Sequence, residues 1–441
     1  MSRPVFRKSV FRSSPLVLAG TLPLLLAFGY AKPTSAARYA EPAGGKFTYS
    51  GGVGAILLEK CASCHRPGEV SPFSLLTYED ARKRAKQIAL VTKSRFMPPW
   101  KADSHGEFVD ERRLSDAQIA AIQEWADAGA PQGDPKAAPP VPKFPAGWKL
   151  GTPDSVVGLS EPYPVAAEGR DVYRCFVIPT NGTEDRFVKA LEVHPGNRTI
   201  VHHVIAYLDT SGTARKLDAK DPGPGYQTSG GGPGFVPTGF LGGWAPGNDA
   251  RFLPPGIGTL LPKGSDIVLE VHYHKSGKPE TDQTKVGIYY AKEPINKRVR
   301  MLPIINPFFK IPAGAEDHVV NAGMPIFSDI TVLGVTPHMH LLGKSMKVTA
   351  TLPDNTQKQI VNVPDWDFNW QISYVFKEPM KLPAGTKLSL VAHYDNSPKN
   401  PHNPNTSPRD VTWGEQTTDE MCIAFLGYTR DDENLLKTAS K

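Results

Sequence analysis

The chain has 441 residues, of which 40 are glycine and 43 are proline. This share is roughly a fifth, above the ~12 % of an average protein but below the ~25 % typical of disordered low-complexity chains, so the composition excludes a disordered chain and a largely helical one. The formal net charge is +6, and five of these charges come from basic residues in the first 36 positions, which hold no acid: Arg3, Arg7, Lys8, Arg12 and Lys32. The remaining chain is close to neutral, which argues against a nucleic-acid or anionic-membrane partner.

Residues 1–36 have the pattern of a secretory signal. A basic start precedes an apolar run from Leu16 to Phe28, and small residues follow at 29–31 and 34–36. The run is shorter than the ~20 residues that span a bilayer, which favours a cleaved signal over the alternative of a retained anchor. We therefore expect an exported protein, periplasmic or secreted, with no membrane span in the mature chain.

The sequence Cys61-Ala62-Ser63-Cys64-His65 is a CxxCH motif, the attachment pattern of haem c. The two thiols bind the haem covalently, and His65 lies where its imidazole can bind the iron. A zinc half-site or a redox dithiol also uses CxxC, but the sequence has no second CxxC to complete a zinc site. Met97 is expected as the second axial ligand of the iron. The alternatives are that Met97 packs in a core, or that His105 is the ligand.

Two helices are predicted around this motif. Thr77 can cap a helix through Ala81–Val91, and Ser115 with Gln118 forms a capping box before a helix that Gly129 ends. A helical segment over 46–130 with CxxCH near its start and a later methionine resembles class I cytochrome c. The resemblance implies a small all-α domain with one covalently bound haem c.

Residues 131–147 are rich in proline, which predicts a semi-rigid linker. Beyond it, short alternating runs lie between turn residues, a pattern typical of antiparallel β-sandwiches. The predicted strands are Val172–Ile178, Val201–Leu208, Ile267–His274, Lys285–Tyr290, Lys347–Leu352 and Lys387–His393. The fold class predicted for the chain is multi-domain: an all-α cytochrome c domain at 46–130, then two all-β sandwiches at 148–300 and 301–431.

Histidines occur in three pairs in the β region: His202-His203, His272 with His274, and His338 with His340. Residues i and i+2 of a strand share a face, so HxH can offer two imidazoles to one metal ion. The adjacent pair would point to opposite faces unless the strand ends or bulges there. Imidazole suits zinc, copper, nickel and iron. The sequence has neither the HExxH helix of zinc proteases nor the nearby cysteine of blue copper sites, which leaves copper bound by histidine.

Five segments in order resemble the copper type II, ascorbate-dependent monooxygenases, which include peptidylglycine α-hydroxylating and dopamine β-monooxygenases. The segments are Val193–Val204, Gly243–Ala245, Leu253–Gly258 with Leu269–Tyr273, Pro337–Lys344, and Thr418–Cys422. The resemblance implies two jelly-roll-like sandwiches that each hold one copper ion. It implies that His202, His203 and His272 bind an electron-transfer copper, and that His338, His340 and Met421 bind the catalytic copper that activates oxygen. His274 is not a ligand in this pattern, and His194 is expected to be structural.

The resemblance implies an oxidoreductase that hydroxylates an activated C–H bond of a small organic substrate with O2. We expect its electrons to pass through the haem c from an external one-electron donor, ascorbate or a redox protein. The alternative is a haem–copper electron-transfer or copper-binding protein without oxygenase turnover. The peptide-hydroxylating members hold a terminal carboxylate with Arg, Asn and Tyr, where this chain has Thr336, Ile423 and Phe425. Without the guanidinium, bidentate carboxylate binding is lost, so a peptidyl-glycine substrate is not expected.

Two cysteines remain after haem attachment, Cys175 and Cys422. They either form a disulfide across the two halves or both stay buried thiols.

Overall fold

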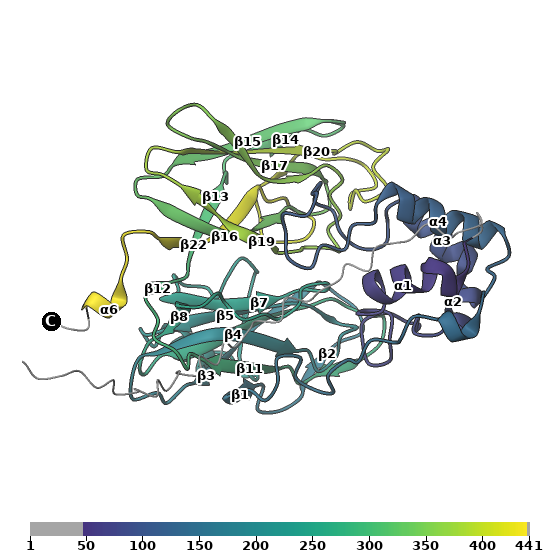
Figure 1. Ribbon diagram of the computed structural model, residues 1–441. Coiled ribbons are helices and arrows are strands. Elements are labelled where there is room, and N and C mark those ends of the chain that lie inside the picture. Colours follow the sequence, from purple (N-terminus) through teal and green to yellow (C-terminus); the bar gives the residue numbers. More distant parts are fainter. Residues whose placement is uncertain (1–46, 439–441) are drawn as a thin grey trace, which may run out of the picture. The chain divides into compact units, whose positions relative to one another are not determined.

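The protein is described by a computed structural model that covers residues 47–438 (Figure 1). The predicted signal at 1–36 lies outside the described residues. Strands account for 35 % of the described residues and helices for 13 %, so this part of the chain is mostly β. No helix in the described part of the chain is long and apolar enough to cross a membrane.

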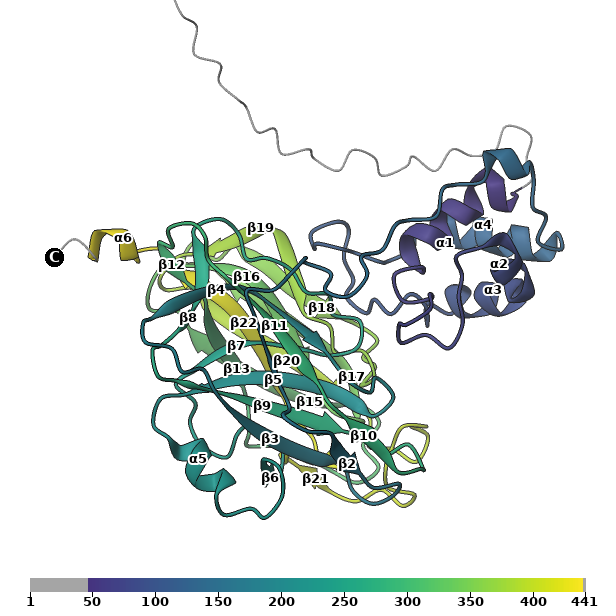
Figure 2. The same ribbon diagram turned by 90° about the horizontal axis from the view of Figure 1, so that it is seen from below.

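The first strands of the chain form two five-stranded sheets, with β3, β9 and β5 side by side (Figure 2). One sheet has the order β1 (Ser155–Gly158), β11 (Lys285–Tyr290), β4 (Arg186–His194), β8 (Ile257–Leu261), β12 (Lys297–Arg298). The other has the order β6 (Tyr226–Thr228), β3 (Val172–Pro179), β9 (Asp266–Tyr273), β5 (Val201–Asp209), β7 (Gly239–Trp244). The short strands β10 (Glu280–Asp282) and β2 (Tyr163–Val165) pair with each other in a separate two-stranded sheet. Apolar side chains of both large sheets, among them Val193 and Leu269, share one buried core.

The later strands form two four-stranded sheets and one short pair. One sheet has the order β13 (Arg300–Ile305), β22 (Ile423–Arg430), β16 (Ile330–His338), β19 (Tyr374–Leu382). The other has the order β15 (His318–Pro325), β20 (Lys387–Tyr394), β17 (Gly343–Thr351), β18 (Gln357–Val363). The short pair is β14 (Lys310–Ile311) with β21 (Val411–Thr412). Alternating inward side chains such as Val332 and Leu390 form a second buried core.

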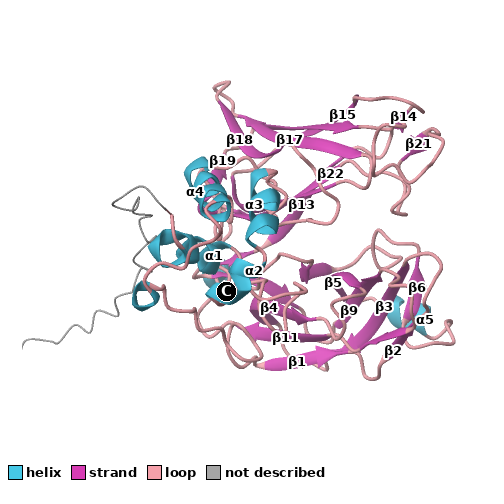
Figure 3. Cartoon of the chain, turned by 90° about the vertical axis from the view of Figure 1, so that its right-hand side faces the viewer, coloured by secondary structure: helices cyan, strands magenta, loops and turns pink. Residues whose placement is uncertain are grey.

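The helices near the start of the described chain lie together (Figure 3). They are η1 (Tyr49–Val53), α1 (Gly54–Lys60), α2 (Tyr78–Lys83), α3 (Ala85–Lys93) and α4 (Asp116–Asp127). The predicted capping box of Ser115 and Gln118 is confirmed at the start of α4. Thr77 caps α2, but the single helix expected through 81–91 is divided at Arg84, whose backbone leaves the helical region at φ −119° and ψ 12°. Short helices also occur later, at η2 (Pro135–Ala137), α5 (Thr213–Asp218) and α6 (Leu435–Thr438).

The predicted fold class, a separate all-α cytochrome c domain followed by two β-sandwiches, is wrong. All the residues that the structure describes fall in one compact unit, so the helices are not a unit of their own. The physical reason lies in the chain between α3 and α4. Trp100 and Phe108 are buried in the core of the later sheets, and Phe108 forms a bridge with Phe376 of β19. The backbone of Val109 donates to Val375 at 2.8 Å, which joins the helical segment to that sheet.

The six strands predicted from alternation are confirmed to within a few residues. The predicted linker 131–147 holds the single helical turn η2 among its described residues. Its Phe144 ring lies 4.3 Å from the guanidinium carbon of Arg66, so this segment packs against the turn that follows CxxCH. The residue boundaries given above for the individual domains stay predictions.

Candidate metal centres

Three histidines from two neighbouring strands meet at one point. Nδ1 of His202 lies 3.3 Å from Nδ1 of His203 and 3.1 Å from Nδ1 of His272. Imidazole binds an ion such as Zn²⁺ at about 2.0–2.1 Å, so nitrogens that share one ion lie about 3–3.5 Å apart. In the described residues this trio is the one group of three or more His, Cys, Asp or Glu side chains placed to hold an ion. The donor set and its spacing therefore fit copper.

A bulge in β5 lets two adjacent histidines point the same way. Val201 pairs with Tyr273 of β9, whereas His203 pairs with His272, so His202 is an extra residue in the strand. A bulge of this kind re-aims a side chain that regular alternation would place on the opposite face. Strand alternation required such a bulge if His202 and His203 were to bind one ion together, and β5 contains it.

Asp171 and Tyr173 hold the third ring of the trio. Nε2 of His272 lies 2.9 Å from Oδ2 of Asp171, and the Tyr173 ring stacks on the imidazole with centroids 4.2 Å apart. A carboxylate on the far nitrogen of a ligand histidine sets its tautomer and orientation. Nδ1 of His272 is thus the nitrogen presented to His202.

Burial keeps the imidazoles of His202 and His203 neutral. Burial and the neighbouring His272 lower the pKa of His202 to about 3, and burial lowers the pKa of His203 well below its ordinary value. A neutral imidazole is the form that binds metal, so at neutral pH these rings release no proton when an ion binds.

A second pair of histidines lies at the end of β16. The rings of His338 and His340 are 5.1 Å apart and nearly perpendicular. Nδ1 of His338 lies 2.7 Å from Oε1 of Gln371, and Nδ1 of His340 lies 3.2 Å from the carbonyl of Asp419. An ion held by this pair would therefore be bound through Nε2. Burial lowers the pKa of His338 to about 4 and that of His340 to about 3.

Glu420 joins the histidine pair to the segment that carries Met421. One carboxylate oxygen accepts from the backbone amides of His340, at 2.8 Å, and of Met421, at 3.1 Å. The other accepts from the amide of Leu342 at 2.6 Å. Glu420 and Met421 are buried, and His338 pairs with Ile423, two residues after the methionine. Through Glu420 the structure thus brings the backbone of Met421 close to the backbone of His340.

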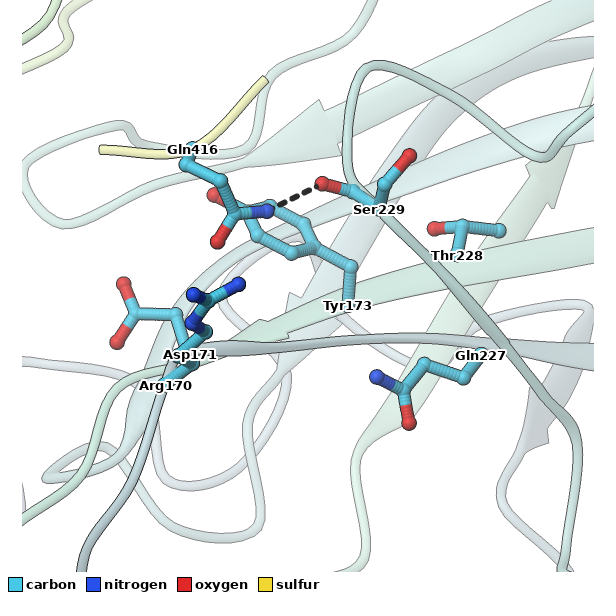
Figure 4. Close-up of a pocket in the computed structure, with 7 residues that line it drawn as sticks. All are labelled: Arg170, Asp171, Tyr173, Gln227, Thr228, Ser229 and Gln416. Atoms are coloured by element: carbon cyan, nitrogen blue, oxygen red, sulfur yellow. Dashed lines mark hydrogen bonds between the residues drawn. The ribbon is translucent and has the colours of Figure 1, made fainter. Parts of the chain in front are cut away.

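A pocket of about 380 Å³ is lined by residues with polar side chains (Figure 4). Two of its lining residues, Asp171 and Tyr173, are those that contact His272. Gln416, from the later half of the chain, closes one side and donates to the carbonyl of Ser229 at 2.8 Å.

The CxxCH motif forms a single turn after α1. The amides of Cys64 and His65 both donate to the carbonyl of Cys61, at 3.2 and 2.9 Å, and both cysteines are free thiols. The His65 ring packs against Phe73, with Nδ1 2.8 Å from Oγ of Ser71. Met97 follows α3, and its amide donates to Val91. Two free thiols on one turn with an adjacent histidine fit covalent attachment of a haem.

The remaining candidates lie outside these sets. His274 is exposed and contacts Asp171, and His105 is exposed with Asp103 at 3.9 Å. His194 stacks on Trp148 with centroids 3.9 Å apart, a packing role. Both remaining cysteines are buried free thiols, so no disulfide joins Cys175 to Cys422.

Sequence reasoning missed the carboxylates that support the histidines. Asp171 lies 101 residues from His272, and Glu420 lies 80 residues from His340. The one available signal was an acidic residue directly before the predicted methionine ligand.

Comparison with known families agrees with this arrangement. Residues 305–438 match the family model of the copper type II ascorbate-dependent monooxygenase, C-terminal domain. The matched range contains the histidine pair of β16, Glu420 and Met421.

Individual proteins with similar sequences are also monooxygenases by name. Putative DBH-like monooxygenase protein 2 from Homo sapiens is 24 % identical over 60 % of this chain and 52 % of its own length. DBH-like monooxygenase protein 1 from Gallus gallus is 25 % identical over 42 % of this chain and 32 % of its own length. The chain thus spans about half or less of the length of these relatives. A solved peptide-N(4)-(N-acetyl-β-D-glucosaminyl)asparagine amidase aligns with 63 % of this chain and 97 % of its own, at 12 % identity and a TM-score of 0.30. Residues 305–438 are thus similar to the C-terminal domain of copper type II ascorbate-dependent monooxygenases, and a larger part of the chain is similar to DBH-like monooxygenases.

Proposed function

We propose that this protein hydroxylates an activated C–H bond of a small organic substrate with O2, using two copper ions and an ascorbate-type or protein electron donor. The observation that supports the proposal is that the chain has two groups of metal-binding side chains that differ in chemistry. One is the convergence of three Nδ1 atoms at His202, His203 and His272. The other is the histidine pair with Met421 inside the matched domain. A protein that merely stores copper needs no second set of different chemistry.

The residues have distinct roles in this proposal. The three-histidine set holds the electron-transfer ion, and His338, His340 and Met421 hold the ion at which oxygen is activated. A soft thioether favours Cu(I), the state that reacts with O2. Bound copper would supply the one-electron redox chemistry. Gln371 orients His338, and Glu420 holds the backbone on both sides of the second site.

We further propose that Cys61 and Cys64 attach a haem c whose iron is bound by His65 and Met97. The motif segment is tied to the first sheets by ion pairs. Glu69 lies 2.6 Å from Arg66 and 3.6 Å from Arg198, and Arg198 is four residues before His202. This connection supports a haem that passes electrons toward the three-histidine set. Export of the protein is part of the same proposal, since residues 1–36 have the pattern of a secretory signal.

Copper content and oxygen uptake test the copper proposal together. The purified protein should bind two copper ions, whereas His272→Ala and His340→Ala should each bind one. With copper bound, oxygen uptake should require an organic substrate from a metabolite panel and should be lost in both variants. Two ions without substrate-dependent oxygen uptake would leave the alternative, a copper-binding or electron-transfer protein.

The haem proposal has a separate readout. The exported protein should show the absorption spectrum of haem c and the mass of one attached haem, and Cys64→Ala should lose normal attachment while still binding two copper ions. A wild-type protein with free thiols and no haem after export with the cytochrome c maturation machinery would contradict it.

A further inference from the structure

One loop of the later half contacts both histidine sets. It runs from Trp366 to Ser373, between β18 and β19. At one end Nε1 of Trp366 donates to the carbonyl of His340 at 3.1 Å, and at the other Gln371 contacts His338. Asn248, from the first half, donates to the carbonyl of Gln371 at 3.0 Å and accepts from the amide of Ser373 at 2.9 Å. The loop is therefore held at both ends.

Phe368, in the middle of this loop, lies between the two sets. Its ring stacks on His202 with centroids 5.2 Å apart and an interplanar angle of 17°. The same ring meets His340 edge-on, with centroids 5.9 Å apart at 87°. Both distances are within the 4.5–7 Å range of favourable aromatic pairs. One half-buried side chain thus contacts a predicted ligand of each copper ion.

We propose that Phe368 couples the two copper sites by providing the contact through which one electron passes from the three-histidine set to the His338–His340 set. The inference rests on the proposed function, since it requires an ion at each set. The step moves one electron and no atoms: the first site is oxidised, the second is reduced, and no bond forms or breaks. Phe368 is a positioning residue, because it acts through His202 and His340.

The physical argument is that electron exchange depends steeply on the space between donor and acceptor. Here the imidazole of His202, the phenyl ring of Phe368 and the imidazole of His340 are in successive contact. Without the phenyl ring, no packed side-chain atoms would lie on the line between the imidazoles of His202 and His340. The hydrogen bonds of Trp366, Gln371 and Asn248 hold the loop without using the ring, so the backbone should persist without it.

The test compares Phe368→Ala, Phe368→Leu and Phe368→Tyr in the full chain loaded with two copper ions. Under anaerobic conditions, one electron is delivered by pulse radiolysis, and its redistribution between the sites is followed by freeze-quench electron paramagnetic resonance. Phe252→Ala is the matched control, since Phe252 is also a partly exposed phenyl ring in contact with an aromatic residue, Tyr289 at 5.5 Å. Copper stoichiometry and affinity are measured on every variant.

We expect Phe368→Ala to slow redistribution by about tenfold or more, equivalent to about 1.4 kcal/mol in the barrier. The redistribution rate of Phe368→Leu should lie between those of wild type and Phe368→Ala, and the rates of Phe368→Tyr and Phe252→Ala should match wild type. Every variant should bind two copper ions at unchanged affinity. An unchanged rate in Phe368→Ala would overturn the proposal. So would weakened copper binding in that variant, because the ring would then merely brace the imidazoles. If Phe368→Ala does not fold, Phe368→Leu decides by the same criteria. A wild-type chain that binds fewer than two ions would instead refute the proposed function.

Discussion

Oδ2 of Asp171 lies 2.9 Å from Nε2 of His272. The opposite nitrogen of the same ring faces His202 at 3.1 Å. The carboxylate therefore determines which nitrogen His272 can offer to an ion, although it is no ligand itself. Such partners typically contribute 10–100-fold to metal affinity.

Replacing this carboxylate should weaken the first copper site. In Asp171→Ala, the His272 ring loses its hydrogen-bond acceptor, and we expect copper affinity at the three-histidine set to fall about 10–100-fold. Competition with a Cu(I) chelator measures this affinity. Asp154→Ala is the control, since Asp154 accepts from the amide of Tyr290 in the other sheet. Equal affinities in the two variants would show that Asp171 does not support the site.

Glu420 makes a comparable prediction for the second site. In Glu420→Gln, an NH2 group replaces one of the two carboxylate oxygens. The backbone amides around it are all donors, so the NH2 group cannot accept from them and a buried hydrogen bond is lost. We expect a destabilisation of about 1–3 kcal/mol and loss of the second copper ion before the first. Urea unfolding and copper content of the purified variant check both parts. The control is Glu415→Gln, because Oε2 of Glu415 is buried without a hydrogen-bond partner. A Glu420→Gln variant that keeps both ions and full stability would contradict the assignment.

The patterns along the chain predicted much of this arrangement. The histidine pairs, the strands that carry them and the cap of α4 follow from local spacing, and the need for a bulge at His202 follows from strand alternation. The element against which Trp100 and Phe108 pack could not be predicted from local spacing. Local periodicity says that such side chains are buried but not against which element, and here they pack against β19 rather than against the helices. Asp171 and Glu420 were missed for a similar reason, since only folding brings them to the histidines.

The ion-pair cluster at Glu433 makes stability depend on pH. Although burial opposes the charge, hydrogen bonds from Arg300 and Arg298 lower the pKa of Glu433 from 4.5 to about 2. A carboxylate with a lowered pKa in the folded state stabilises the fold fully above its unfolded pKa, and this contribution is lost as the pH falls from about 4.5 toward 2. We expect Glu433→Gln to lose about 1.5–3 kcal/mol at pH 7 and to approach wild-type stability near pH 2–3.

Urea unfolding of both proteins at pH 7 and pH 3 tests this expectation. The control, Glu184→Gln, removes a solvent-exposed carboxylate 3.3 Å from Arg186 and should change stability little at either pH. A Glu433→Gln deficit that stays constant between the two pH values would rule out the linkage.

The second site also predicts which substrates fail. Thr336 stands where the resemblance to the peptide-hydroxylating monooxygenases would place an arginine. Its hydroxyl lies 2.8 Å from the hydroxyl of Ser373, and Ile423 is buried and apolar. With no guanidinium at Thr336, a substrate carboxylate lacks its bidentate partner there. We expect a glycine-extended peptide not to be hydroxylated, as checked by mass spectrometry of the peptide after incubation with the copper-loaded protein and ascorbate. Turnover of that peptide at the rate of the best substrate would refute this.

The measurement that tests the central claim most directly is the fate of ¹⁸O2 in a reaction with copper-loaded protein, a reductant and the substrate found in the uptake panel. A monooxygenase places one ¹⁸O atom in the hydroxylated product and the other in water, and the label should disappear from the product when copper is removed or His340 is replaced by alanine. A hydroxylated product whose oxygen comes from water, or oxygen uptake that forms only hydrogen peroxide, would contradict the account.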